Sequence, residues 1–463
     1  MSKKKPDLTE DPILPTLLKL TWPMIFGMLG SVLFNLADTY FLGRVGVNEL
    51  AAMGFTFPAV MFVSSVAAGV GIGTASLFSR AIVVKKLSEV QRYSTSIFIL
   101  ALLVIVIFIA LGLWTLKPLF RLLGAGEEII PLIADYMTIW YWAVFLVVIP
   151  MVGNNMIRAT GNMFAPGMIM VFGNVINIIL DPLFIFGMGP LPEMGIKGAA
   201  LATAISMGST CILSLYILIK KERLLVLVWP VFKEMIDVWK QVLAVGIPAA
   251  MAILITPLSI GFITRILAGF GPDAVAAFGV VSRLEMFAFT LIYALGSVLT
   301  VFAGQNWSAR KPGRLRKGIN ISAQFSLGLG LFFFVISQLF ASGIASVFTD
   351  SKSVIEIAAS YLTIVSFSYG FQGILMLCTS TLDGINRPLV SFSLSLLRML
   401  VLYVPLAWLT SNAFGLNGIF WSAFTANLAA GTVAWYWLQK IISKQTTVIK
   451  QPEQKQEMLF AAK

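Results

Sequence analysis

Twelve long apolar runs constrain the fold of this chain more than any other feature. A helix needs about 20 mostly apolar residues to cross a bilayer. The runs cover residues 13–40, 51–79, 93–116, 129–151, 163–187, 196–219, 241–267, 274–304, 318–348, 354–378, 388–410 and 415–439. Only 12% of the residues are charged and 58% are hydrophobic, whereas a soluble globular chain carries roughly 25% charged residues. The sequence therefore predicts an all-α polytopic membrane protein and excludes a soluble enzyme.

The basic residues indicate how the runs are oriented. Lysine and arginine concentrate in the cytoplasmic segments of membrane proteins, and this chain has 33 of them against 21 acidic residues. If the N-terminus is placed in the cytoplasm, most basic residues fall on that side, including clusters at 3–5, 220–223 and 310–317. We therefore predict an even number of spans with both termini cytoplasmic. The positive charge then belongs to the topology, and no nucleic-acid partner is expected.

An internal repeat divides the spans into two sets of six. Residues 42–62 recur as residues 267–287. The identical pairs are Leu42/Leu267, Gly46/Gly271, Ala51/Ala276, Ala52/Ala277, Gly54/Gly279, Met61/Met286 and Phe62/Phe287. Because six is even, both halves have the same orientation, which predicts a pseudo-two-fold axis along the membrane normal with a cavity between the lobes. We assign 1–222 to the N-terminal lobe and 223–463 to the C-terminal lobe with a short cytoplasmic tail.

Two acidic residues lie inside predicted spans of the first lobe. Asp38 falls late in the first span, three residues after Asn35, and Asp181 falls in the fifth. An Asp at the centre of a membrane helix costs about 2.5–3.5 kcal/mol. Asn174, Asn177 and Asp181 are spaced i, i+3 and i+7, which places them on one helical face. This polar face is predicted to turn away from lipid, in the outer half of the membrane.

The second lobe lacks these acids. The repeat aligns Asp38 with Ile263 and Asp181 with Val404. If the acids only supported the fold, both lobes would be expected to need them, so we interpret them as a proton or cation site. The alternative is a buried pair satisfied by asparagines and hydroxyls. The chain has no histidine, but a carboxyl group removed from water can exchange a proton near neutral pH.

Other polar residues in the spans are weaker candidates. Tyr136, Asn154 and Thr203 lie on neighbouring spans of the first lobe, where they could bind substrate or simply pack between helices. The second lobe contains embedded charges whose partners the sequence leaves open, namely Arg283, Glu285 and Arg398. With no histidine and two cysteines in apolar runs, the chain offers no metal-binding cluster.

Several motifs together resemble one transporter family. They are Asn35 to Asp38, the loop of residues 42–54, Arg158-Ala-Thr-Gly-Asn162 and the segment from Asn177 to Pro182. With the repeat, they are similar to the multidrug and toxic compound extrusion (MATE) transporters, in particular the DinF-type branch. The resemblance implies a V-shaped fold of two lobes and cation-coupled antiport of organic cations and other amphipathic drugs. It also implies a monomer in the bacterial inner membrane.

The resemblance assigns roles to individual residues. The coupling site would comprise Asp38, Asp181, Asn177, Asn174, Asn35 and Thr203, with Tyr136, Asn154, Asp38 and Asn177 binding substrate. In this branch, protonation is proposed to bend the first span at a proline, and Pro23 occupies the matching position. NorM-type members carry second-lobe acids in spans 7 and 10, whereas predicted span 7 here has none. That difference favours protons over sodium as the coupling ion.

Alternative functions stay open at this point. The chain could be a sodium-coupled antiporter, or a flippase for lipid-linked precursors or other amphiphiles within the same superfamily. An intramembrane aspartyl protease is disfavoured, because neither Asp38 nor Asp181 follows a Gly-x-Gly motif. No Gly-x-x-x-x-Gly-Lys-[Ser/Thr] loop is present to bind ATP. We expect no cofactor beyond the coupling ion, and the sequence leaves the physiological substrate open.

Overall fold

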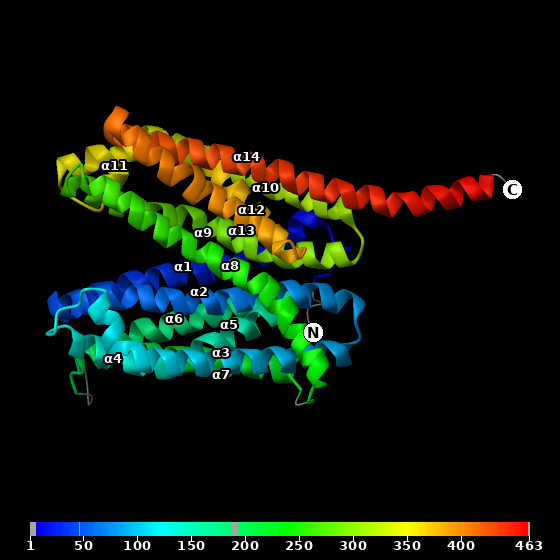
Figure 1. The fold of residues 1–463 in the computed structure, drawn as a ribbon, viewed down its shortest axis with the longest axis horizontal. Helices are drawn as coiled ribbons and strands as arrows, with labels where there is room; N and C mark the ends of the chain where they lie inside the picture. The colour runs from blue at the N-terminus through cyan, green and yellow to red at the C-terminus, as the bar shows by residue number, and fades with distance from the viewer. Residues whose placement is uncertain (1–5, 46, 188–191, 227, 462–463) are drawn as a thin grey trace. The chain divides into compact units, whose positions relative to one another are not determined.

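The computed structural model describes residues 6–45, 47–187, 192–226 and 228–461, which fold into helices with no strand among them (Figure 1). Side chains are described throughout these ranges except at 35–36, 39–40, 42–43, 47–48, 50–51 and 448–461. The predicted role of the Asn35 side chain therefore lies outside the described residues.

The first half of the chain forms the helices that correspond to predicted spans one to six. They are α1 (Ile13–Val45), α2 (Val47–Val84), α3 (Leu87–Leu122), α4 (Ile130–Trp142), α5 (Val144–Ala159), α6 (Phe164–Ile185), α7 (Gly195–Tyr216) and the π-helical turn η1 (Ile217–Lys221). The predicted run 129–151 is two helices, α4 and α5, which meet at Ala143 with a bend of 43°.

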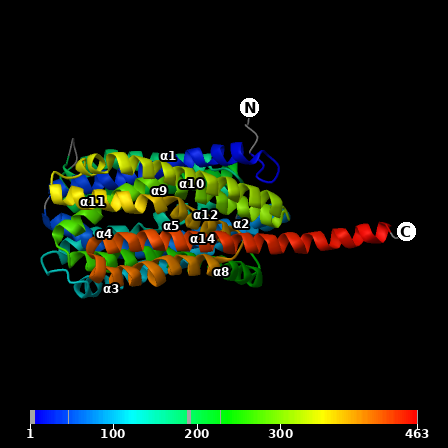
Figure 2. The ribbon, with the colours of Figure 1, turned by 90° about the horizontal axis from the view of Figure 1, so that it is seen from above.

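The second half repeats this plan. It contains α8 (Phe232–Ala268), α9 (Pro272–Ser308), α10 (Pro312–Ser346), α11 (Lys352–Val365), the 3₁₀ turn η2 (Ser366–Ser368), α12 (Tyr369–Gly384), α13 (Pro388–Leu396), the π-helical segment η3 (Leu397–Tyr403) and α14 (Val404–Ala461). Figures 1 and 2 both show the last part of α14 continuing as one helix past the ends of its neighbours.

The number of membrane spans follows from helix length and hydropathy. Among the described residues, ten helices are long and apolar enough to cross a membrane, and the bent pair α4 and α5 makes eleven. The last of the ten, Pro388–Thr447, has 60 residues, far more than the roughly 20 that one span requires. It is interrupted at Gly415, whose φ of 59° and ψ of −143° are not helical. This break divides it in two, and the predicted all-α fold of twelve transmembrane helices is confirmed.

The helices group into two compact units. The first unit is Leu20–Ala250, and the second consists of the segment up to Lys19 together with Met251–Lys463. Both boundaries fall inside helices, one in α1 and one in α8. The lobe boundary at residue 222 was inferred from the repeat rather than from contacts, and it stays a prediction.

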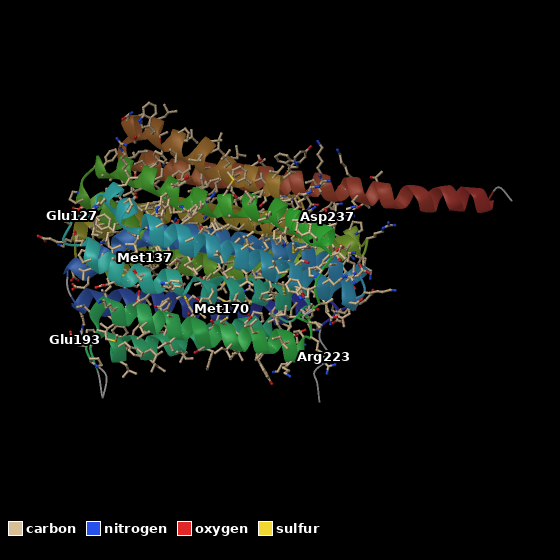
Figure 3. All side chains as sticks on the ribbon, turned by 60° about the horizontal axis from the view of Figure 1, so that its bottom comes forward. Glu127, Met137, Met170, Glu193, Arg223 and Asp237 are labelled. Atoms are coloured by element: carbon tan, nitrogen blue, oxygen red, sulfur yellow. The ribbon has the colours of Figure 1, made fainter. Side chains whose placement is uncertain are left out.

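The first unit has connections at two opposite ends. Figure 3 shows Glu127 and Glu193 at one end and Arg223 and Asp237 at the other, with Met137 and Met170 between them. Glu127 lies between α3 and α4, and Glu193 between α6 and α7, whereas Arg223 lies between α7 and α8. This alternation is what a chain produces when it crosses a membrane back and forth, as the sequence predicted.

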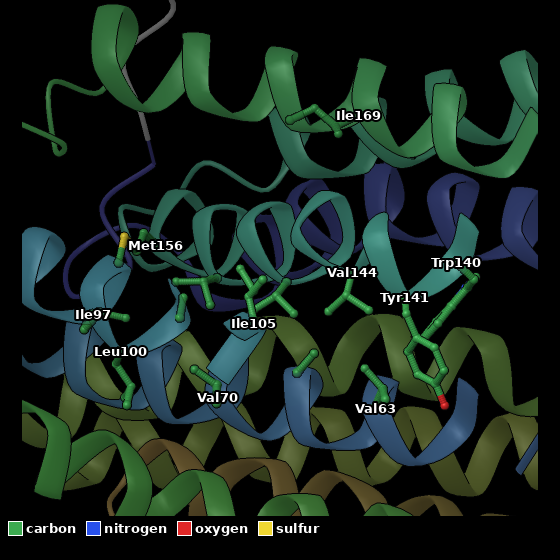
Figure 4. Close-up of a cluster of buried hydrophobic side chains, with 14 of the residues drawn as sticks. Val63, Val70, Ile97, Leu100, Ile105, Trp140, Tyr141, Val144, Met156 and Ile169 are labelled. Atoms are coloured by element: carbon green, nitrogen blue, oxygen red, sulfur yellow. The ribbon is translucent and has the colours of Figure 1, made fainter. Parts of the chain in front are cut away.

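The core of the first unit is built around α5. Val144, Val148, Val152 and Met156 recur every four residues and are fully buried, so they form one stripe along the helix. Figure 4 shows Val144 and Met156 within a cluster of apolar side chains that includes Val70 of α2. This packing holds α5 in place and positions the polar residues of the adjoining helices.

Candidate functional site

The polar face of α6 points into the first unit. Asn177 is 2% exposed and Asp181 is fully buried. The Asn174 side chain is partly buried and contacts α1. Because a helix places residues i, i+3 and i+7 on one side, the packing of this one face brings all three into the interior. A buried carboxyl group of this kind needs partners, and its surroundings define the site.

Asn177 connects Asp181 to the neighbouring helix α7. With its amide nitrogen facing the carboxyl group, Asn177 donates to Asp181 Oδ2 at 2.9 Å and accepts from the backbone N–H of Thr203 at 3.2 Å. The opposite orientation would turn the amide oxygen toward a carboxyl oxygen. Asp181 Oδ1 is buried and has no hydrogen-bond partner among the described residues. One oxygen of this carboxyl group is therefore available to a proton.

Asp38 and Tyr136 complete the group. The partly buried carboxyl group of Asp38 on α1 interacts electrostatically with that of Asp181. The Tyr136 hydroxyl on α4 interacts with both carboxyl groups, and this side chain is only 6% exposed. The structure thus brings together Asp38, Tyr136, Asn177, Asp181 and Thr203 from four helices. This electrostatic interaction between the two carboxyl groups disfavours the state in which both are ionised.

Asn174 fastens α6 to α1. Its Nδ2 donates to the backbone oxygen of Gly27 at 3.3 Å and to Ser31 Oγ at 3.1 Å. The two helices approach closely here, because a Cβ added at Gly167 would lie 2.5 Å from the backbone oxygen of Pro23. Asn174 therefore holds α6 against the part of α1 that follows the predicted hinge at Pro23.

A cavity of about 280 Å³ adjoins this group. Its polar lining includes Asn154, Asn174, Asn177 and Thr203, and the rest is largely apolar, with methionines such as Met170 in its wall. Neither Asp38 nor Asp181 lines it. Asn177 therefore both lines the cavity and bonds the carboxyl group of Asp181. A flexible, polarizable methionine lining suits ligands of varied shape.

A polar stripe on α7 was missed by the sequence interpretation. Ser206 and Thr210 line the cavity, and Ser214 Oγ donates to Asn154 Oδ1 at 3.0 Å. Together with Thr203, these residues recur every three or four positions. That periodicity is visible in the sequence and marks one helical face, so it could have identified α7 as a wall of the site.

The embedded charges of the second unit lie in a separate polar cluster. Glu285 Oε1 accepts a hydrogen bond from the Tyr361 hydroxyl at 3.0 Å. Arg398 Nη1 donates to Asn427 Oδ1 at 3.0 Å and interacts electrostatically with Glu285. Arg283, by contrast, has an exposed side chain. The partners of Glu285 and Arg398 come from α11 and α14, which the sequence spacing did not identify.

Comparison with known proteins supports the repeat and the fold. The MatE family model matches residues 23–183 and again residues 248–409. The two matches begin as far apart as Leu42 and Leu267, where the repeat was recognised. The crystal structure of the Vibrio cholerae MATE transporter VcmN in the bent form has a TM-score of 0.88 and 31% sequence identity. It covers 94% of this chain and 98% of that one.

Curated relatives align over almost the whole chain. The FAD transporter of Shewanella oneidensis is 36% identical over 95% of this chain and 97% of its own length. The multidrug export protein MepA of Staphylococcus aureus is 25% identical over 90% of this chain and 91% of its own length. The family model covers more than half of the residues, and the relatives are named as transporters rather than enzymes. This chain therefore belongs to the MatE family of multi-pass membrane transporters.

Proposed function

We propose that this protein is a proton-coupled antiporter that exports small amphipathic molecules by alternating access, with Asp38 and Asp181 as the proton-binding site. The observation that carries the proposal is the buried Asp181 carboxyl group, which has one oxygen held by Asn177 and the other without a hydrogen-bond partner among the described residues. A structural carboxylate would be expected to have both oxygens satisfied. A carboxyl group that binds and releases a proton needs one that is available.

The geometry suggests how a proton would displace a cationic substrate. With one or both carboxyl groups ionised, their negative charge attracts a cation into the adjoining cavity. A proton taken up from the outside removes that charge, and Asn177 transmits the change to the cavity wall because it bonds Asp181 and lines the cavity. The substrate then leaves on the side from which the proton came.

Transport into vesicles tests the coupling. Purified protein in proteoliposomes is supplied with a fluorescent organic cation and driven first by a proton gradient and then by a sodium gradient. We expect uptake with the proton gradient alone. Uptake driven only by sodium would establish the sodium-coupled alternative instead.

The variant Asp38→Asn tests the site in the same vesicles. We expect it to lose proton-driven uptake while its expression and thermal stability stay close to wild type. Asp135→Asn is the matched control, because Asp135 forms an ion pair with Lys197 at 3.3 Å and both side chains are exposed, at 40% and 50%. The proposal fails if Asp38→Asn transports at the wild-type rate or if both variants lose transport equally.

A second candidate concerns the substrate. The relative at 36% identity over 95% of the chain is named a FAD transporter, so we propose flavin dinucleotides as a second substrate class. The cavity of about 280 Å³ is smaller than a whole dinucleotide and would hold only one part of it. Export is measured as FAD released from cells that express the protein, against Asp38→Asn cells. Release of FAD that competes with a drug cation would indicate one shared route.

A further inference from the structure

The segment just before α1 is bound to the second unit by a set of specific contacts. Leu8 is 1% exposed, and its backbone oxygen accepts from Asn306 Nδ2 at 3.1 Å and from Arg314 Nε at 3.0 Å. Lys311 donates to the backbone oxygen of Thr9 at 3.2 Å and forms an ion pair with Glu10. These partners lie at the C-terminal end of α9 and the N-terminal end of α10, within or next to the basic cluster at 310–317.

The bound segment is itself an ordered turn. Asp7 Oδ1 accepts from the backbone N–H of Thr9 at 2.8 Å and from its hydroxyl at 2.7 Å. Asp11 Oδ2 in turn accepts from the backbone N–H of Asp7 at 2.8 Å. The Thr9 hydrogen bonds hold the pKa of the Asp7 carboxyl below its ordinary value of 3.8. The carboxylate therefore stays charged at neutral pH. Its contribution to the turn is lost only when the pH falls through this lowered pKa.

The position of this segment on the chain gives it a mechanical meaning. Residues up to Lys19 belong to the second unit, whereas α1 from Leu20 onward belongs to the first unit and carries Asp38. Pro23 lies inside α1 just past this boundary. A proline within a helix removes one backbone hydrogen bond and permits bending. The N-terminal end of α1 thus belongs to the second unit, and Asp38 on the same helix belongs to the first unit. Pro23 lies just past the boundary between these two parts of α1.

We propose that residues 7–11 form a clasp that keeps the N-terminal end of α1 attached to the second unit throughout the transport cycle. The inference rests on the proposed transport function for its consequence, but the clasp itself can be measured without transport. The C-terminal end of α9 and the N-terminal end of α10 thus bind residues 7–11 of the same chain. Its recognition depends on backbone oxygens offered to Asn306 and Arg314.

The first experiment measures the clasp directly by hydrogen exchange of the full-length protein. Arg314→Gln removes a charged donor to the backbone oxygen of Leu8. We expect the amides of residues 8–16 to exchange about tenfold faster or more. Arg316→Gln is the matched control, because Arg316 is exposed on the same helix. Unchanged exchange in Arg314→Gln would overturn the clasp, whether or not the protein transports anything.

The second experiment asks whether the clasp stays closed. Glu10→Cys and Lys311→Cys are combined in a background without Cys211 and Cys378, which are both buried, and are joined by a bifunctional thiol reagent with a flexible spacer. We expect the joined protein to transport a fluorescent cation within about twofold of the unjoined protein. Arg314→Gln should transport about tenfold more slowly than Arg316→Gln.

Two outcomes would overturn the proposal. If joining the two cysteines stops transport while substrate binding persists, the clasp has to open during the cycle. If Arg314→Gln transports as fast as Arg316→Gln, the clasp has no part in transport. Failure of the wild-type protein to transport in the same vesicles would instead contradict the proposed function, and the exchange measurement would still test the clasp.

Discussion

At the scale of single residues, Asn177 is the position on which the site depends. It bonds Asp181, bonds the backbone of Thr203 and lines the cavity. An asparagine suits this place because it supplies a donor and an acceptor without adding a charge. An aspartate here would put a third carboxyl group beside the other two. In the proposed mechanism, the residue thus links the carboxyl group of Asp181 to the cavity through one short side chain.

The variant Asn177→Ala should separate these two properties. It leaves Asp181 Oδ2 and the Thr203 amide without their partner, which costs about 1–3 kcal/mol for each buried group. We expect proton-driven uptake to fall about tenfold or more, with a small drop in melting temperature. Asn155→Ala serves as the control, because Asn155 bonds only the backbone oxygen of Met151 one turn earlier in its own helix. Equal uptake by the two variants would remove Asn177 from the coupling site.

The sequence predicted which residues of α6 share one face. The spacing of Asn174, Asn177 and Asp181 fixed their shared face, since helix geometry depends only on position along the chain. The sequence could not predict the hydrogen bond between Asn177 and the Thr203 backbone, because that bond depends on how α7 is rotated against α6. The tyrosine near Glu285 escaped notice for the same reason. Contacts between helices depend on how the helices pack, and the residue spacing within one helix does not reveal that packing.

At the scale of elements, α1 and α6 approach each other closely beside the site. Gly167 faces the backbone of Pro23 with no room for a larger side chain, and a Cβ added at Gly30 would lie 3.0 Å from Asn174 Nδ2. Close approach of this kind is typical of small residues between membrane helices. It keeps the predicted hinge of α1 against the helix that carries Asp181.

Gly167→Ala should disturb this contact. The added Cβ would lie 2.5 Å from the Pro23 backbone oxygen, and backbone atoms move less easily than side-chain ends. Overpacking of this kind costs about 1–3 kcal/mol, so we expect a lower melting temperature in detergent. Gly208→Ala is the control, because its Cβ would make only an ordinary contact of 3.7 Å with Leu146. A melting temperature unchanged in both would show that α1 and α6 separate easily.

Pro23→Ala addresses the hinge itself. Alanine restores the missing backbone donor and stiffens the helix, so we expect normal expression, at least unchanged thermal stability and strongly reduced proton-driven uptake. The measurement is the initial uptake rate in vesicles. Wild-type uptake by Pro23→Ala would contradict a role for bending.

The helix boundaries illustrate what local sequence can and cannot predict. The break within α14 occurs at Gly415, the first residue of the last predicted apolar run, so the sequence had already placed a boundary there. The bend between α4 and α5 occurs at Ala143 instead. No proline or glycine lies there to announce it, so it was predicted as one span. Tertiary packing sets this bend, and only the folded structure reveals it.

At the scale of the whole molecule, the apolar runs and the repeat were sufficient to predict twelve transmembrane helices in two similar halves. Duplicated helices fold alike, and the family model matches both halves. The compact units were not predicted, since the segment up to Lys19 joins Met251–Lys463 through contacts made far along the chain. Such long-range contacts leave no periodic signal.

The predicted topology can be checked by labelling. Glu127→Cys and Arg223→Cys lie at opposite ends of the first unit (Figure 3). In a background without Cys211 and Cys378, a membrane-impermeant maleimide should label Glu127→Cys on intact cells and Arg223→Cys only after the cells are opened. The reverse pattern would place both termini outside.

The position of Asn177 in the lining of the cavity has a consequence for how transporters of this family change their substrates. Asp38 and Asp181 do not line the cavity. If they bind the coupling proton, as proposed, a substrate in the cavity does not have to contact them. Mutations of the methionines and hydroxyls around the cavity can then change what is carried and leave the energy source intact. Relatives named for drugs and for a dinucleotide are expected to differ mainly in the residues that line this cavity.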